Sequence, residues 1–107
     1  MAADEDTLVL LWTSGNRHVA LDMAFVYAEY SIKEEWWEEV RIFIWGASTW
    51  LIKQDSELRE RLVDLKAMDG ITVEACRICA ESYDAEDVLE ELDIDVDYVG
   101  EDLTKDL

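Results

Sequence analysis

The chain has 107 residues, and half of its composition is hydrophobic, so we expect a single folded domain spanning residues 1–107. Twenty-seven Asp and Glu residues against nine Lys and Arg residues give a formal net charge of −18. A field of this sign repels phosphate backbones and anionic lipid surfaces, which argues against nucleic acid as a partner. A solvated acidic surface explains the charge more simply than a specific basic partner, and adaptation to a high-salt cytoplasm is a further hypothesis.

The amino terminus and the two cysteines indicate a compartment. The first six residues are Met-Ala-Ala-Asp-Glu-Asp, acidic where a signal peptide is basic, and no apolar stretch approaches the roughly 20 residues of a membrane span. We therefore expect a cytoplasmic protein without a membrane span. In that setting two cysteines three positions apart indicate a reduced dithiol or a redox pair, not a secreted disulfide scaffold.

The first half of the chain alternates strand-like and helical patterns. Thr7 to Thr13 is a continuous apolar run typical of a central parallel strand covered on both faces. A turn follows, and the stretch from about His18 to Tyr30 has the apolar spacing of an amphipathic helix. Its larger apolar residues are Val19, Met23, Val26, Tyr27 and Tyr30, with Ala20, Ala24 and Ala28 permitting close approach. Val40 to Trp45 predicts a second parallel strand, ended by Gly46.

The second half repeats the alternation. Ser56 to Met68 is the clearest helix, capped by Asp55 or Ser56 and ended by Gly70. Ile71 to Val73 predicts a buried strand, with Cys76 just past its carboxyl end. Asp84 is expected to cap a helix over Ala85 to Leu92. Ile94 to Val99 alternates apolar residues with Asp, as a half-exposed edge strand does, and Gly100 to Leu107 forms a polar tail.

Four strands alternating with helices predict an α/β fold, a small doubly wound and mainly parallel sheet in three α/β/α layers. If the strand order is 2-1-3-4, the winding reverses between the first and third strands. The crevice at such a switch point would bring the turn Ser14-Gly15-Asn16 beside Cys76.

The Cys76-Arg77-Ile78-Cys79 sequence carries the clearest chemistry. A helix N-terminus and Arg77 would lower the pKa of a thiol at this point and favour the nucleophilic thiolate, although the negative charge of the protein acts in the opposite direction. The alternative is that either cysteine is an inert small residue of the core. We predict Cys76 and Cys79 as the catalytic pair. The predicted substrate-binding residues are Ser14, Gly15, Asn16, Arg77 and Trp45.

Other residues give weaker signals. Ser14-Gly15-Asn16 lacks the glycine spacing of dinucleotide folds and the Lys of a P-loop, so an ordinary turn is its simpler interpretation. Two cysteines and His18 are too few for zinc within one chain, and we expect no metal and no cofactor. Trp12, Trp45 and Trp50 lie near the carboxyl ends of the first two strands or just after them, where they could roof a pocket. Trp36 and Trp37 cannot both point into one core, so at least one is a candidate for subunit contact.

Three segments resemble a known family. They are Gly70-Ile-Thr-Val-Glu-Ala-Cys76 before a short helix, Trp45-Gly46-Ala47-Ser48 after the second strand, and Val99-Gly100-Glu101 near the end. Together they make the chain similar to the DsrE/DsrF-like family of small sulfur-relay proteins. The resemblance implies a flavodoxin-like sheet, a homotrimer or hexamer, sulfur donor and acceptor proteins as partners, and a persulfide carried on Cys76. Arg77-Ile78-Cys79 stands where relay members have small residues, and Glu81-Ser82-Tyr83-Asp84 where they have basic ones.

The expected function is therefore sulfur relay, in which Cys76 carries persulfide sulfur and passes it to an acceptor thiol. Two alternatives remain open. One is a non-enzymatic oligomeric module that binds a small molecule or a protein and whose thiols are incidental. The other is a dithiol redox protein that uses both cysteines.

Overall fold

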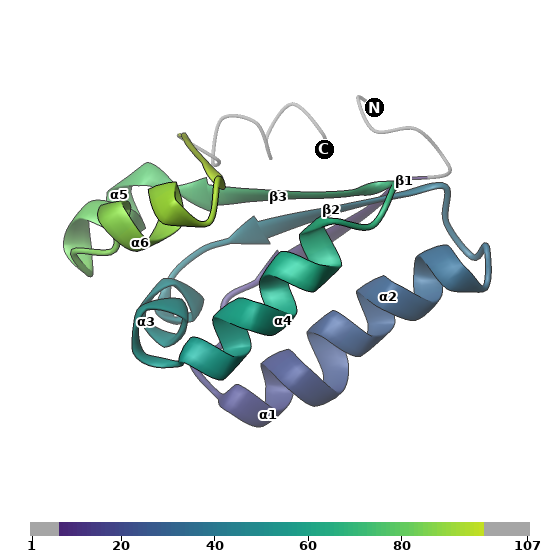
Figure 1. Cartoon of the computed structure of the whole chain (residues 1–107), viewed down its shortest axis with the longest axis horizontal. Coiled ribbons are helices and arrows are strands. Elements are labelled where there is room, and N and C mark those ends of the chain that lie inside the picture. The colour runs from purple at the N-terminus through teal and green to yellow at the C-terminus, as the bar shows by residue number, and fades with distance from the viewer. Residues whose placement is uncertain (1–6, 98–107) are drawn as a thin grey trace.

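The computed structural model describes residues 7–97, and these residues form a four-stranded sheet in which every pairing is parallel (Figure 1). The strands are β1 (Thr7–Trp12), β2 (Glu39–Ile44), β3 (Ile71–Cys76) and β4 (Asp95–Asp97). Helices alternate with the strands along the chain. The expected α/β class, with a parallel sheet in a flavodoxin-like arrangement, is confirmed.

The helices agree with the apolar periodicity in position and differ in extent. After β1 and a short turn come three helical segments that continue one another without a break. They are α1 (Arg17–Val19), the π-helical η1 (Ala20–Ala24) and α2 (Phe25–Lys33). Between β2 and β3 lie α3 (Ala47–Gln54) and α4 (Ser56–Lys66). The last two helices are short, α5 (Arg77–Ser82) and α6 (Glu86–Glu91). Among the residues described, no helix is long and apolar enough to cross a membrane.

The strand order is β1-β2-β3-β4, so the expected order 2-1-3-4 is wrong. Right-handed connections between strands that are neighbours in both sequence and space place successive helices on the same face of a sheet. Figure 1 shows α2, α3 and α4 together on one side of the sheet. No switch point exists between β1 and β3, because β2 lies between them. The second helical layer of the expected three-layer arrangement is not found within residues 7–97.

The core lies between the sheet and these helices. The strand residues facing it alternate with those facing the other way: Leu8, Leu10, Trp12, Val40, Ile42, Ile44, Ile71, Val73 and Ala75. From the helices, Phe25 packs its ring edge-on against Trp12 at 5.0 Å between centroids. Ala80 of α5 and Leu89 of α6 join the same cluster. The opposite sheet face carries a small second cluster, built on Phe43 and Cys76.

The helix after β1 packs on the sheet through its small residues. Ala20, Ala24 and Ala28 are buried together with Phe25, whereas the larger apolar residues Val19, Met23, Tyr27 and Tyr30 are exposed. Alanine brings the helix backbone close to the sheet, and the bulkier side chains then point away from it. The amphipathic pattern predicts the helix correctly, but its larger apolar stripe faces outward.

Two details at the end of the chain differ from expectation. The residue before α6 is Ala85, and no side chain caps that helix, so Asp84 is not its cap. Asp84 has φ of +53° and belongs to the preceding turn. The edge strand is confirmed for Asp95–Asp97, while Val99, Gly100 to Leu107 and the Val99-Gly100-Glu101 segment lie outside the described residues.

Gly70 gives a test of this fold. It has φ of +92°, and a Cβ added there would lie 2.9 Å from the carbonyl oxygen of Glu38. We expect Gly70→Ala to lower the free energy of unfolding by about 1–3 kcal/mol, because both the left-handed backbone and the close approach disfavour a side chain. Chemical denaturation measures the change. Asp69→Ala, an exposed neighbour in the same turn, is the control, and its free energy of unfolding should stay within about 0.5 kcal/mol of the wild type. An equal loss of stability in both variants would contradict the assignment of backbone strain to position 70.

Candidate thiol site

The two cysteines lie at the carboxyl edge of the sheet, where β3 passes directly into α5. Cys76 is the last residue of β3 and the N-cap residue of α5, and Cys79 lies within α5. Both are free thiols. Cys76 is buried, with 4% of its surface exposed, whereas Cys79 is half-buried. Cys79 is therefore the outer thiol of the pair and Cys76 the inner one.

The inner thiol packs in the second cluster, on the sheet face opposite the helices. Phe43 of β2 is fully buried beside it, and Val9, Trp45 and Cys79 pack against the cluster. Of the three tryptophans expected to roof a pocket, only Trp45 belongs to this cluster. Trp12 is buried in the main core, and Trp50 is exposed. The thiols thus have an apolar, aromatic environment.

A backbone amide points at the outer thiol. The N–H of Gly46 donates to Sγ of Cys79 at 3.2 Å. Gly46 has φ of +75° in the turn between β2 and α3, and hydrogen bonds to β1 hold that turn. Trp45 N–H donates to the carbonyl of Trp12 at 3.1 Å, and the Ser48 hydroxyl donates to the same oxygen at 2.6 Å. The donor that faces Cys79 is consequently fixed by the ends of two strands.

Burial raises the pKa of the Cys79 thiol above its ordinary value. The Gly46 hydrogen bond acts in the opposite direction, and contact with Cys76 adds to the rise. The sequence left open the balance between the groups that lower a thiol pKa in this motif and the negative field of the protein; for Cys79, desolvation is the dominant effect and the pKa is raised. At neutral pH Cys79 is held as the thiol, so its reactions require a base or a transient opening of the site.

Arg77 makes a different contact from the one expected. Its Nη2 donates to the carbonyl oxygen of Val96 at 2.8 Å, which ties α5 to β4. A binding role for Arg77 stays a prediction, as do the roles of the other predicted site residues. Trp45 is the predicted binding residue that packs in the cluster containing both thiols.

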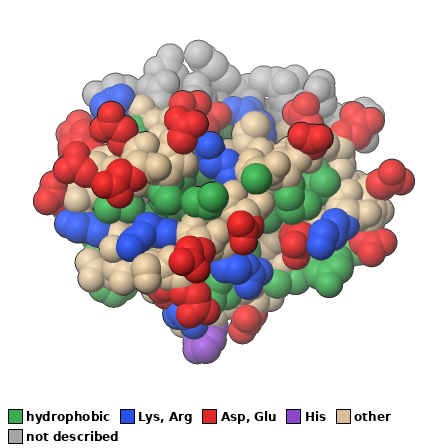
Figure 2. All heavy atoms as spheres, viewed as in Figure 1, with side chains coloured by type: hydrophobic (Ala, Val, Ile, Leu, Met, Phe, Trp, Pro, Cys, Tyr) green, Lys and Arg blue, Asp and Glu red, His purple; other side chains and the backbone are tan. Residues whose placement is uncertain are grey.

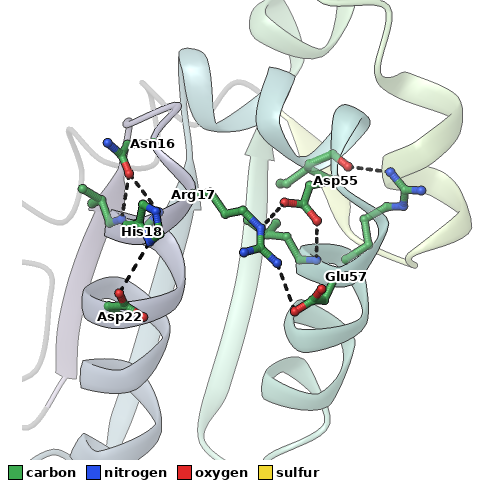
Figure 3. Close-up of polar contacts among 10 residues, drawn as sticks. Asn16, Arg17, His18, Asp22, Asp55 and Glu57 are labelled. Carbon is green, nitrogen blue, oxygen red and sulfur yellow. Dashed lines mark hydrogen bonds and ion pairs between the residues drawn. The ribbon is translucent and has the colours of Figure 1, made fainter.

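Ser14, Gly15 and Asn16 do not lie beside Cys76, because β2 separates the end of β1 from β3. Their polar groups serve the local turn. Asn16 Oδ1 accepts from the backbone N–H groups of His18 at 2.8 Å and Val19 at 3.3 Å, so Asn16 caps α1 (Figure 3). These contacts favour the interpretation of the segment as an ordinary strand-to-helix turn.

A charged cluster next to this turn holds two helices together (Figure 3). Arg17 Nε lies 2.6 Å from Asp55 Oδ2, and Arg17 Nη2 lies 3.0 Å from Glu57 Oε1. Asp55 also accepts from the N–H of Leu58 at 3.0 Å and so caps α4, as expected. That backbone hydrogen bond, followed by the contact with Arg17, lowers the pKa of Asp55. The cluster joins the start of α1 to the start of α4 and is structural.

Metal-binding geometry is not found in the part of the chain that the structure describes. Within residues 7–97 no three His, Cys, Asp or Glu side chains are grouped to hold an ion. His18 is exposed and faces Asp22 of the next helical turn, at 3.8 Å between Nδ1 and Oδ2.

An apolar groove between β1 and the following helix is the feature that the sequence interpretation missed. Its volume is about 240 Å³. The lining residues are Leu10, Leu11, Trp12, Thr13, Ser14, Val19, Met23, Ala24 and Tyr27, none of them charged. The signal for it was present, because one helix carried both a stripe of Ala and a stripe of larger apolar residues and could turn only one of them inward.

Comparison with known proteins gives one match. No protein-family model and no curated protein matches the chain. A solved structure, described as a conserved protein of unknown function, BT1422 from Bacteroides thetaiotaomicron, superimposes with a TM-score of 0.88. The two are 34% identical, over 94% of this chain and 85% of that one. This chain belongs to the same family as BT1422. The description of BT1422 names no activity, so the BT1422 family establishes the fold, and the chemistry must be argued from the site.

The burial of the two thiols predicts their order of reaction. With iodoacetamide, native Cys79 should be alkylated several-fold faster than Cys76, and its rate should reach half its maximum at a higher pH than in the denatured chain, because burial raises the Cys79 pKa. Peptide mass spectrometry at a series of pH values measures both rates. The denatured chain is the control, in which the two thiols should react alike near pH 8.5. Faster labelling of Cys76 in the native protein would contradict the assignment of inner and outer thiols.

Proposed function

We propose that this protein is a sulfur-relay protein of the DsrE/DsrF-like kind, which carries sulfane sulfur on the pair Cys76 and Cys79. The observation that supports this most directly is the contact between two free thiols in an apolar cluster, with the Gly46 amide donating to the outer sulfur. A backbone N–H stabilises negative charge developing on sulfur during transfer. The aromatic side chains of Phe43 and Trp45 keep water from a labile persulfide.

The difference in burial assigns a role to each thiol. Cys79, the more accessible, meets the donor: its thiolate attacks the outer sulfur of a donor persulfide, becomes Cys79-S-SH and releases the donor thiolate. The Cys76 thiolate then takes the outer sulfur, giving Cys76-S-SH and regenerating the Cys79 thiolate. Reversal of these steps hands the sulfur to an acceptor thiol. This revises the simpler scheme in which Cys76 meets the donor itself, because Cys76 is only 4% exposed.

The scheme requires partners of defined chemistry. The donor is a protein or small molecule carrying a persulfide, and the acceptor presents a free thiol. Both cysteines must be reduced between transfers, which suits the cytoplasm. The acidic surface suits partners whose docking faces are basic.

Persulfide loading tests the proposal. After incubation with a persulfide donor and removal of excess reagent, the wild type should gain about 32 mass units, the mass of one sulfur atom. Cys76→Ser should retain no stable gain in mass, because a persulfide on the more accessible Cys79 stays open to attack by the donor thiol, which takes the sulfur back. Cys79→Ser should load at a small fraction of the wild-type rate, because Cys76 is buried. Intact-protein mass spectrometry over time measures all three.

Ile78→Ala is the matched control, since Ile78 lies between the cysteines with an exposed side chain and both thiols remain. It should load like the wild type. Stable loading of Cys76→Ser, or a wild type that gains no sulfur, would reject the relay.

The contact between the thiols also favours a second candidate, a dithiol redox protein. In that case oxidised glutathione should convert Cys76 and Cys79 to a disulfide with the loss of about 2 mass units, while two glutathione thiols form and carry away the two electrons and two protons. A protein that loses this mass reversibly but never retains a sulfane sulfur is the redox protein. A protein that does neither is a binding module with incidental thiols.

A further inference from the structure

β1 lies at an edge of the sheet but has the sequence of a central strand. Among residues 7–97 it pairs with β2 alone. Its residues, Thr-Leu-Val-Leu-Leu-Trp, include no charge and no proline, the devices that normally protect an exposed edge. The opposite edge has them, because β4 reads Asp-Val-Asp. Within residues 7–97, β1 therefore presents an unprotected edge that suits pairing with a strand of another chain.

An exposed apolar surface runs along this edge. We call it the edge patch and define it by Leu11 of β1, four residues on the helix and one beyond it: Leu11, Val19, Met23, Tyr27, Tyr30 and Trp36. Met23 is 66% exposed and Trp36 59%. The helix returns antiparallel to β1, so its stripe follows the strand (Figure 1). Tyr, Trp and Met are the residues enriched at protein interfaces.

The edge patch is ordered within the subunit. The rings of Tyr27 and Trp36 lie 6.2 Å apart, and Trp37 Nε1 donates to the Tyr27 hydroxyl at 3.4 Å. Trp37 turns toward the core while Trp36 faces outward, which confirms that the two tryptophans divide between core and surface. Rigid aromatic side chains lose little entropy on docking and so suit an interface.

The groove inside the edge patch suits a protein side chain better than a small molecule. Its volume of about 240 Å³ lies below the roughly 300–1,000 Å³ typical of ligand pockets. Aliphatic and aromatic side chains supply nearly all of its lining. A protein partner that also pairs with the β1 backbone would fill the groove and satisfy the edge at once.

Charge selects the partner. The chain carries −18, and acidic side chains are spread over the face seen in Figure 2. A basic partner would gain most by docking on those carboxylates. An equally acidic partner can approach closely only where they are absent, and none lines the groove. A second copy of this chain suits this surface, because its own β1 and groove are also free of charged side chains and the two uncharged surfaces can meet away from the carboxylates.

We propose that β1 and the edge patch form a two-fold interface between two copies, with β1 antiparallel to the β1 of the partner subunit. Such pairing continues the sheet through both copies and places apolar residues of β1 opposite apolar residues of the same strand. The segments α1, η1 and α2 of the two copies then lie side by side on one face and bury the helical residues of the edge patch, while Leu11 lies at the junction of the two β1 strands. Of the assemblies implied by the family resemblance, a hexamer contains such an axis and a homotrimer does not. The interface is independent of the thiol chemistry.

A lysine at the edge tests the interface. Leu11 is 43% exposed, so Leu11→Lys leaves the core intact while placing a charge on the β1 edge of each copy. Sedimentation equilibrium should give an even number of copies for the wild type and half that mass for Leu11→Lys. Added NaCl should strengthen association of the wild type, because salt screens the repulsion between two acidic copies.

Val63→Lys is the matched control, because Val63 is 45% exposed on α4, outside the edge patch, and it should keep the wild-type mass. Met23→Lys is a second disrupting variant at a more exposed position and should halve the mass as Leu11→Lys does. Circular dichroism verifies that each variant is folded. A wild type that is monomeric or odd-numbered, or a wild-type mass in both Leu11→Lys and Met23→Lys, would overturn the proposal.

Discussion

Each strand of this sheet pairs with the next one along the chain, and that constraint determines where the remaining features lie. Right-handed connections between successive neighbours carry the helices to one face, so a single core forms between that face and the helices. The same constraint leaves β1 at an edge. It also puts the side chains of Phe43 and Cys76 on the face away from the helices. Thiol site and exposed edge are thus two results of one winding pattern.

The thiol site balances opposing effects. Removal from water disfavours the thiolate of Cys79, and the Gly46 amide favours it. A sulfur that is neutral at rest and meets a fixed donor when charge develops reacts selectively, with a partner that opens the site. In the proposed relay, the more buried Cys76 behind it would separate contact with partners from storage of the transferred sulfur atom.

The spacing of apolar residues predicted the helices and strands well, because it depends only on neighbouring residues within each element. The apolar run of β1, the stripe of α4 and the Asp alternation of β4 each report burial within a few residues. Strand order has no such local signal, and the order 2-1-3-4 was wrong for that reason. Residue size also did not predict which face of the helix after β1 points to the sheet. Close packing of the helix buries Ala24 and Ala28 and leaves the larger Met23 and Tyr27 exposed.

The candidate site was predictable in part. The position of the cysteines at the carboxyl end of the third strand and the nearness of Trp45 followed from the sequence. The direction of the Cys79 pKa shift did not, because helix end and Arg77 are visible in the sequence whereas desolvation depends on what packs around the sulfur. The substrate-binding role of Asn16 stays a prediction, whereas its capping contacts with the N–H groups of His18 and Val19 agree with the simpler interpretation of an ordinary turn.

The acidic β4 has a consequence for growth of the assembly. A sheet that is adhesive at both edges adds subunits without limit and ends as a fibre. Among residues 7–97, the strand at the edge opposite β1 carries the exposed carboxylate of Asp95, which disfavours pairing with another strand. In the proposed two-fold assembly, the outer margin of each copy within residues 7–97 is the acidic β4. The sheet proposed here would therefore end at two subunits rather than grow by further edge pairing.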